Sequence, residues 1–219
     1  MATKKQTQTK RLTMVERAKE QMEKHFPDHD RLPLWNRKKN DGYSTIPRTL
    51  PIAMQAIDAL SKGNPGGHTL FCLWARAPDH PLIVIDSPTT FAAEAGFSGE
   101  RASDTWRRRM KRLRDLGFIR TKKGTSGDFH YVLLLNPNIA LNQLKEEGKL
   151  QESLADRFDD RLGEIGAKRD LQEYKEKLED LDEDEREESE ESKGKTTVRR
   201  KKNKRPAIKK TDDSQKEES

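Results

Sequence analysis

Apolar residues concentrate in the middle of this chain. Phe, Trp, Ile, Leu and Val cluster between Ile46 and Leu144, whereas the flanking segments are mostly polar and charged. Such segments bury too little apolar surface to offset the entropy that is lost on folding. We therefore predict one folded domain over residues 45–145. A basic arm with a short amphipathic helix and a linker (1–44) precedes it, and a charged helical segment (146–182) and a disordered, first acidic and then basic tail (183–219) follow.

The first half of the predicted domain shows helical spacing. In residues 51–63, "PIAMQAIDALSKG", the apolar positions share one helical face and a glycine ends the pattern. Residues 68–77, "HTLFCLWARA", fit a buried helix or a strand equally well by period. We favour a helix with Leu70, Leu73 and Trp74 turned inward. Residues 87–97, "SPTTFAAEAGF", begin with an N-cap serine and a proline, which predicts a helix of about two turns.

Three segments are typical of strands. Residues 81–86, "PLIVID", are β-branched and bounded by prolines. Residues 118–124 and 129–137 form two more runs, and the glycines of "KKGTSGD" between them suit a hairpin tip. "NIALNQL" then starts one more helix. The predicted fold class is mainly α with a small antiparallel sheet, in the form of a winged helix-turn-helix core with helical and disordered charged arms.

Residues 101–116, "RASDTWRRRMKRLRDL", have a strongly two-sided pattern. Four of them fall in a narrow stripe of a helix and must face the core: Ala102, Trp106, Met110 and Leu113. The other long side chains then point away from the core. They comprise six cations and only two anions, Asp104 and Asp115, too few for pairing along the helix to account for the excess. The six cations are Arg101, Arg107, Arg108, Lys111, Arg112 and Arg114.

The order of these predicted elements is that of a winged helix-turn-helix domain. In such a domain the second helix of the turn motif enters the major groove of DNA, and its N-terminal residues reach base edges. The N-terminal half of the helix predicted over residues 101–116 contains Arg101, Ser103, Arg107 and Arg108. We expect Arg107 and Arg108 to bind base edges, because guanidinium groups match guanine O6 and N7.

Further cations are placed for the phosphate backbone. Lys111, Arg112 and Arg114 follow along the same helix, and phosphate contacts fix position without reading sequence. Lys122, Lys123, Thr125 and Ser126 are expected at an exposed hairpin tip, where the two ammonium groups and free backbone donors could meet phosphate or an adjacent minor groove. The alternative for both sets is a solvated charged surface.

The block from "NDGYSTIPRTLP" to "LLLNPNIAL", including "FAAEAGFSGERASDTWRRRMKRLRDLGFIRT", resembles winged-helix proteins that are carried on bacterial plasmids and integrative elements. The similarity covers a little under half of the chain. It implies DNA binding in replication, maintenance or transcriptional control, and a bacterial cytoplasmic, nucleoid-associated location. "RRRMKRLRDLGFI" is also a generic winged-helix pattern, and the two arms lie outside the resemblance.

The arms contain two further helical patterns. From Thr13, "TMVERAKEQMEKHF" has apolar residues at intervals of four, which predicts a short amphipathic helix. Residues 150–182 carry apolar residues at near-heptad spacing on both sides of a break at Gly163 and Gly166. This pattern indicates either a helix that forms a homodimer or binds a partner, or a single charged helix in solvent.

Composition narrows the function further. The formal charge is +6, from 44 Lys and Arg against 38 Asp and Glu, and the single cysteine, Cys72, excludes a disulfide framework. No zinc-type spacing, phosphate-binding loop, nucleophile elbow or apolar membrane span is present in the sequence. We expect no enzyme, metal, cofactor, small-molecule substrate or membrane partner, and double-stranded DNA as the main ligand. The alternatives are a protein-binding adaptor and a nucleoid-type protein that coats DNA without sequence preference.

Overall fold

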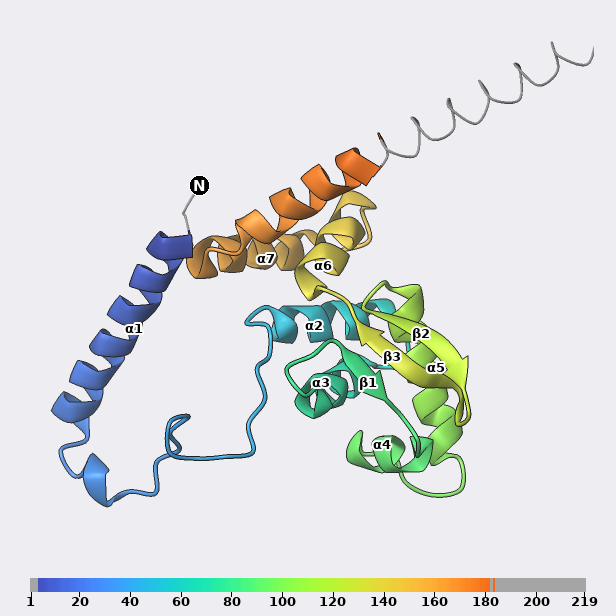
Figure 1. The fold of residues 1–219 in the computed structure, drawn as a ribbon, viewed down its shortest axis with the longest axis horizontal. Coiled ribbons are helices and arrows are strands. Elements are labelled where there is room, and N and C mark those ends of the chain that lie inside the picture. The colour runs from blue at the N-terminus through green and yellow to red at the C-terminus, as the bar shows by residue number, and fades with distance from the viewer. Residues whose placement is uncertain (1–3, 182, 184–219) are drawn as a thin grey trace, which may run out of the picture. The chain divides into compact units, whose positions relative to one another are not determined.

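The computed structural model describes residues 4–181 and residue 183 (Figure 1). It is mainly helical with a small three-stranded antiparallel sheet, which confirms the coarse part of the prediction, a mainly α fold with a small antiparallel sheet. In chain order the elements are α1 (Lys4–His25), a 3-10 turn (His29–Arg31), α2 (Leu50–Leu60), α3 (Gly67–Arg76), β1 (Leu82–Val84), α4 (Pro88–Glu94), α5 (Ala102–Asp115), β2 (Ile119–Gly124), β3 (Gly127–Leu134), α6 (Pro137–Glu146) and α7 (Glu152–Ile165). Residues 168–181 are also helical. No helix of the described residues has the length and apolar character needed to cross a membrane.

Helix α1 begins earlier than the sequence pattern predicted. It starts at Lys4 rather than at Thr13. The added residues, polar except for Leu12, include good helix formers and no Gly or Pro, so nothing in them stops the helix. The helix ends at His25, directly before Phe26 and Pro27, as predicted. Val15 and Phe26 are exposed, so the described apolar positions of this segment are not part of the core.

The sheet has the order β1-β3-β2, with β3 in the centre and both neighbours antiparallel to it. Its inner face is apolar: Ile83 of β1 lies opposite Val132 of β3, and Ile119 of β2 lies opposite Leu134. All four side chains are buried. The strand runs predicted from residues 81–86, 118–124 and 129–137 are thereby confirmed.

The outer face of the sheet also carries apolar side chains. Leu82 and Val84 of β1 lie opposite Leu133 and Tyr131 of β3, and these four residues are each more than a third exposed. Among the described residues of the sheet's own domain, no helix or strand packs on this face.

Helices α2 and α3 pack against each other at close range. A Cβ on Gly67, the first residue of α3, would lie 2.8 Å from Cβ of Met54, a separation that real Cβ atoms do not show. The backbone N–H of Gly67 donates to Oδ1 of Asp58 at 2.8 Å. These interactions fix the turn between the two helices, and they confirm the helical interpretation of residues 68–77, with Leu70 and Leu73 buried and Trp74 partly buried.

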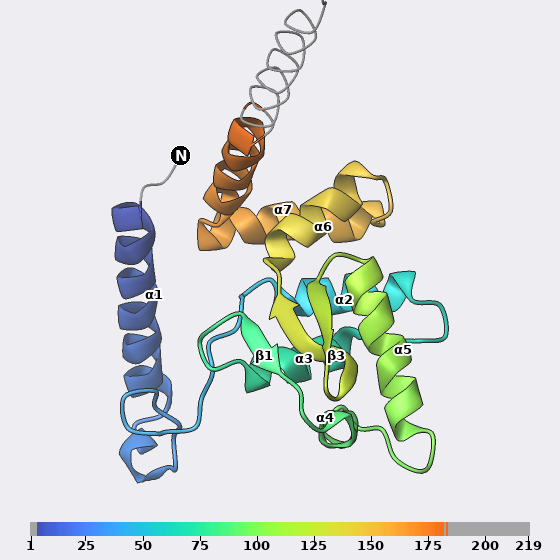
Figure 2. The same cartoon turned by 45° about the vertical axis from the view of Figure 1, so that its right-hand side comes forward.

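Helices α6 and α7 lie against α2 and extend the core beyond residue 145 (Figures 1 and 2). Leu154, Phe158 and Leu162 of α7 are almost fully buried in the same apolar cluster as the rest of the domain. The first half of the near-heptad pattern therefore does not form a seam that is open to a second chain. The heptad-like spacing is equally that of a helix buried along one face, which is how α7 uses it.

The break predicted at Gly163 and Gly166 occurs at Gly166 alone, because α7 continues through Gly163. Gly166 has a φ of +69° and ends α7, and the N–H of Ala167 donates to the carbonyl oxygen of Leu162 at 3.0 Å, a common helix end. In the helical residues that follow, Leu171 is partly buried, whereas Leu178 and Leu181 are exposed. Apart from Glu183, the acidic and basic tail predicted for residues 183–219 lies outside the described residues.

Candidate nucleic-acid interface

Helix α5 buries the stripe that its sequence predicted. Trp106, Met110 and Leu113 are at most 1% exposed. The indole ring of Trp106 lies between two phenyl rings, 6.4 Å from the centroid of Phe91 and 5.9 Å from that of Phe129. This aromatic cluster joins α5 to α4 on one side and to β3 on the other, so the direction of the outer face of α5 is set by the core.

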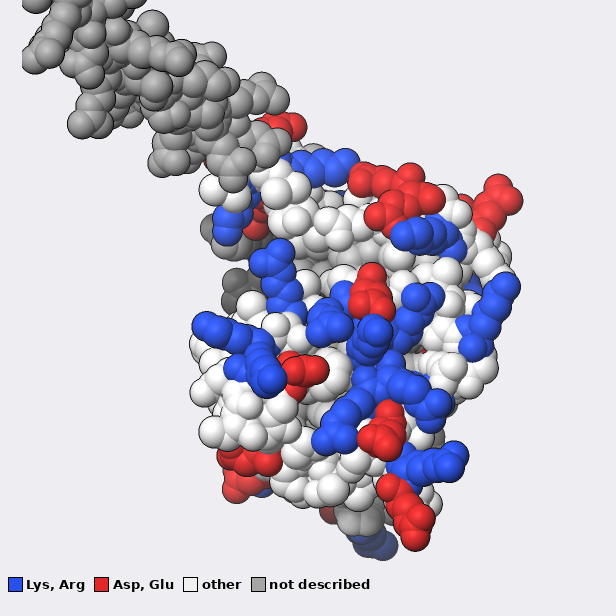
Figure 3. Space-filling model, turned by 90° about the vertical axis from the view of Figure 1, so that its right-hand side faces the viewer, with Lys and Arg blue, Asp and Glu red and all other residues white. Residues whose placement is uncertain are grey.

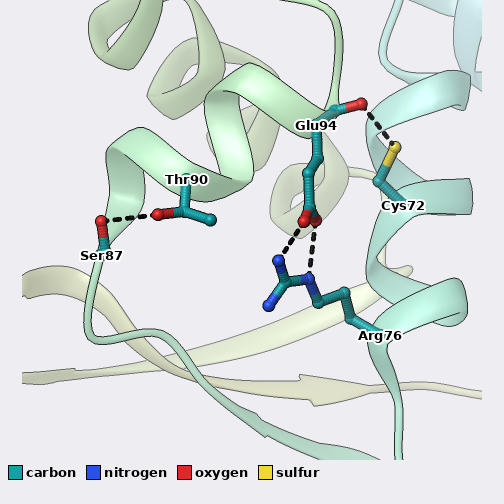
Figure 4. Close-up of polar contacts among 5 residues, drawn as sticks. All are labelled: Cys72, Arg76, Ser87, Thr90 and Glu94. Carbon is teal, nitrogen blue, oxygen red and sulfur yellow. Dashed lines mark hydrogen bonds and ion pairs between the residues drawn. The ribbon is translucent and has the colours of Figure 1, made fainter.

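Helix α4 is held in turn by α3 (Figure 4). The guanidinium group of Arg76 makes a two-pronged ion pair with the carboxylate of Glu94, with Nε 2.7 Å from Oε2, and this hydrogen bond lowers the pKa of Glu94. The thiol of Cys72 donates to the carbonyl oxygen of Glu94 at 3.5 Å, and burial raises the pKa of this thiol. Two side chains of α3 thus fix the end of α4, from which the chain turns into α5.

The outward cations of the first half of α5 are exposed and only lightly engaged. Nη1 of Arg107 donates to Oδ1 of Asp104 at 3.2 Å, and Nη2 of Arg108 donates to Oγ1 of Thr105 at 3.2 Å. Exposed ion pairs of this kind contribute about 0–1 kcal/mol, so a polyanion can displace them at little cost. Arg101 is exposed at the N-cap of α5, and Ser103 in the first turn is half-buried.

Two of the residues predicted to bind phosphate also hold α5 in place. Nη2 of Arg112 donates to the carbonyl oxygen of Leu60 at 2.6 Å, at the end of α2, and its Nε donates to Oγ of Ser61 at 3.3 Å. Nη1 of Arg114 donates to Oγ1 of Thr121 in β2 at 3.4 Å. These two guanidinium groups therefore stand on opposite flanks of the helix. Arg112 is not the freely available cation that the sequence pattern predicted, because its donors are directed at the end of α2.

Lys111 lies on the exposed ridge of α5 between these flanks. Its ammonium group has no ion-pair partner among the described residues, so it presents a full positive charge to solvent.

Arg109 is an arginine of α5 that the sequence analysis did not single out. Arg109 is 8% exposed, and its Nε and Nη1 have no hydrogen-bond partner among the described residues. Its guanidinium carbon lies 5.8 Å from the ring centroid of Phe97, in the turn before α5. Burial, followed by the charge of Arg108, lowers the pKa of Arg109. The sequence held the signal, because Arg109 follows Trp106 by three positions and precedes Leu113 by four, which places it at the buried stripe.

The β2–β3 hairpin is tighter than the sequence suggested. Gly124 and Gly127 pair across it, so the tip consists of Thr125 and Ser126 alone, while Lys122 and Lys123 belong to strand β2. Between the pairs Lys122–Tyr131 and Gly124–Gly127 the register shifts, and three residues of β3 lie opposite the single residue Lys123 of β2. Both lysines are exposed.

Ser126, which the sequence pattern placed at an exposed tip, is partly buried. Its hydroxyl donates to the carbonyl oxygen of Ile85 and lies 2.9 Å from Nδ1 of His130, so it faces the protein. A Cβ on Gly124 would collide with the ring of His130, and only glycine fits there. The tip is therefore tied back to the segment after β1, and Thr125 is its exposed residue.

A further basic residue comes from a part of the chain that the sequence pattern did not connect with α5. Lys62, in the turn between α2 and α3, lines a hollow together with Arg108, Lys111 and Arg112. No sequence signal pointed to it, because about fifty positions separate this turn from α5.

We call the exposed cations of this side of the domain the basic face. Figure 3 views the molecule from the side on which α5 and β2 lie in Figure 1, and it shows Lys and Arg gathered there with a few Asp and Glu between them. The basic face comprises Lys62, Arg101, Arg107, Arg108, Lys111, Arg114, Lys122 and Lys123. The nine side chains predicted to touch DNA belong to α5, its N-cap or β2; Ser103 and Arg112 are the two that are partly enclosed.

In the part of the chain that the structure describes, no three His, Cys, Asp or Glu side chains come together in a way that could hold a metal ion.

Comparison with protein-family models, with curated proteins and with solved structures gave no match for this chain.

Proposed function

We propose that this protein binds double-stranded DNA with sequence preference, through a winged helix-turn-helix domain. In this proposal α4 and α5 are the helix-turn-helix, α5 lies in the major groove, and the β2–β3 hairpin is the wing. The supporting features are the element order, the strand order β1-β3-β2 and the basic face. The observation that carries the proposal is the two-sidedness of α5, which buries Trp106, Met110 and Leu113 and directs its cations outward.

The dimensions of α5 suit this role. Its 14 residues span about 21 Å at 1.5 Å per residue, and a helix with its side chains is about 10–12 Å across, comparable to the ~12 Å width of the major groove. Arg107 and Arg108 are our candidates for binding base edges. Lys111, Arg114, Lys122 and Lys123 are candidates for binding phosphates, and they supply affinity without sequence information.

The biological task that we infer is replication, maintenance or transcriptional control of a bacterial mobile element. It rests on the resemblance of residues in the central block to winged-helix proteins of plasmids and integrative elements. In each of these tasks the protein acts by occupying a site, without chemistry of its own.

A second candidate function, a protein-binding adaptor, is favoured by the outer sheet face. Leu82, Val84, Tyr131 and Leu133 form an exposed apolar surface, and such surfaces often mark protein interaction sites. An adaptor, however, has no need of the basic face, and for this reason we rank DNA binding first.

The test is a selection of duplexes from a random pool by the full-length chain, followed by affinity measurements on the selected duplex. Replacing Arg107 or Arg108 by Ala removes the guanidinium group that would bind a base. Each substitution is expected to cost about 1–3 kcal/mol of binding free energy and to relax the preference at one base pair. Arg157→Ala on the exposed side of α7 is the matched control and leaves both affinity and preference unchanged.

Three results separate the candidate functions. Enrichment of one sequence supports the proposal. Binding without any enrichment points instead to a protein that coats DNA, and failure to bind duplexes at low ionic strength refutes DNA binding and leaves the adaptor function.

A further inference from the structure

A hollow lies on the domain surface where the α2–α3 turn faces the second half of α5. Its volume is about 260 Å³. The polar side chains that line it are mostly cationic: Lys62, Asn64, Arg108, Lys111, Arg112 and one anion, Asp115. Four positive charges against one negative charge in so small a space repel one another unless an anion joins them.

The wall of this hollow is fixed before any ligand arrives. Arg112 bridges α5 to the carbonyl oxygen of Leu60 and to the hydroxyl of Ser61, and the N–H of Asn64 donates to the carbonyl oxygen of Ser61 at 2.6 Å. The close approach of Gly67 to Met54 holds the other end of the turn. A site built on such a fixed wall does not need to order its backbone when it binds.

The charges of the hollow are not all neutralised within the protein. Arg112 faces the C-terminal end of α2, whose partial negative charge it offsets. The anion, Asp115, lies 4.0 Å from Nε of Arg114, a cation outside the hollow. Lys62 and Lys111 are exposed and have no ion-pair partner among the described residues. Two ammonium groups are therefore free to bind an oxyanion, and Asn64 can add an amide donor.

We propose that this hollow is a phosphate-binding site, formed by Lys62 and Asn64 of the α2–α3 turn together with Lys111 of α5. Ammonium and guanidinium groups with an amide donor are the groups that bind phosphate oxygens in proteins. The phosphate comes either from the DNA backbone beside the groove that α5 occupies or from a free phosphate ion. The first source rests on the function proposed above, and the second does not.

If the hollow binds a phosphate of the DNA backbone, substitution of Lys62 changes the salt dependence of duplex binding. For the full-length chain on a selected duplex, Lys62→Gln is expected to reduce the slope of log Kobs against log salt by about 0.9, since one fewer phosphate is neutralised. Equivalently, the affinity decrease between about 50 and 200 mM salt becomes about 3.5-fold smaller. Lys62→Arg keeps the charge and is expected to keep the slope. Lys168→Gln, an exposed lysine away from the hollow, is the matched control.

Binding of a free phosphate ion is tested without DNA. Inorganic phosphate is added to the full-length chain at constant ionic strength, with chloride as the balancing anion, and the backbone amide resonances of residues 61–64 are followed by NMR. Saturable shifts at these amides in the wild type that disappear in Lys62→Gln support the site. Urea denaturation midpoints of all variants check that the domain is folded.

The outcomes separate this inference from the proposed function. A smaller slope in Lys62→Gln but not in Lys62→Arg or Lys168→Gln supports the DNA backbone as the source. Phosphate-dependent shifts with an unchanged slope support a free phosphate ion as the source. Duplex binding by the wild type with neither effect overturns the phosphate site and leaves DNA binding standing. If the wild type ignores duplexes, DNA binding fails, and the phosphate titration alone decides: shifts support the site, and their absence overturns it.

Discussion

Asp104 is expected to weaken DNA binding although it lies in the middle of the basic face. Its Oδ1 accepts a hydrogen bond from Nη1 of Arg107 at 3.2 Å, and the two side chains are 73% and 48% exposed. An exposed ion pair of this kind contributes about 0.2–1 kcal/mol, which Arg107 must give up in order to reach DNA. Asp104→Asn removes this competition and also one negative charge opposite the polyanion. We therefore expect the affinity for a selected duplex to rise by about 1.4- to 5-fold, the same free energy expressed as a ratio.

The same substitution should act in the opposite direction on folding. Asp104 lies in the first turn of α5, where a negative charge interacts favourably with the helix dipole. Its neutralisation is expected to lower the free energy of unfolding by about 0.3–1 kcal/mol. A gain in affinity together with a decrease in stability distinguishes this mechanism from a general tightening of the structure.

Fluorescence anisotropy of a labelled duplex measures the affinity, and urea denaturation measures the stability. Asp156→Asn on the exposed side of α7 is the matched control, since it changes the net charge equally but lies away from the basic face. A weaker binding of Asp104→Asn with an altered base preference would refute the reasoning. It would mean that the carboxylate itself accepts a hydrogen bond from cytosine N4.

Three other predictions concern the β2–β3 hairpin, the core and α7. Replacing both Lys122 and Lys123 by Gln should lower the salt slope of duplex binding by about 0.9 for each phosphate that is no longer neutralised, and an unchanged slope would remove the hairpin from the interface. Trp106→Ala should lower the free energy of unfolding by about 3–5 kcal/mol in urea denaturation, because it leaves a cavity between two aromatic rings, and a decrease below about 1 kcal/mol would contradict this packing. Phe158→Ala is expected to cost a similar amount, whereas a dimer-forming role of this residue predicts a change in sedimentation and little change in the stability of the folded domain.

The features that the sequence predicted best are those that depend on local periodicity. The stripe of α5 and the glycine-bounded hairpin follow from the spacing of neighbouring residues, which is a direct consequence of helix and strand geometry. The hydrogen bond from Arg112 to Leu60 joins positions 52 apart, and no local pattern encodes it. For the same reason no local pattern connects Lys62, in the turn between α2 and α3, with the cations of α5.

The near-heptad pattern of residues 150–182 shows a different limit. A one-sided apolar helix packs equally well against a second chain or against its own domain, and spacing does not distinguish the two. In the first half of this pattern, α6 lies directly before α7 and an apolar surface of α2 receives both helices, so the apolar face of α7 is buried in its own domain. Arg109 was not identified from the sequence as a buried residue, because arginine is charged and is usually exposed. Its spacing from Trp106 and Leu113 nevertheless places it beside the buried stripe.

The link from Ser126 to Ile85 and His130 has a consequence for the speed of the DNA binding proposed above. A hairpin that swung freely would have to find its orientation anew at every encounter, and most collisions would be unproductive. Hydrogen bonds of Ser126 tie this tip to the segment after β1, so in the proposed binding mode β2 and α5 would meet a rod-shaped polyanion in one orientation.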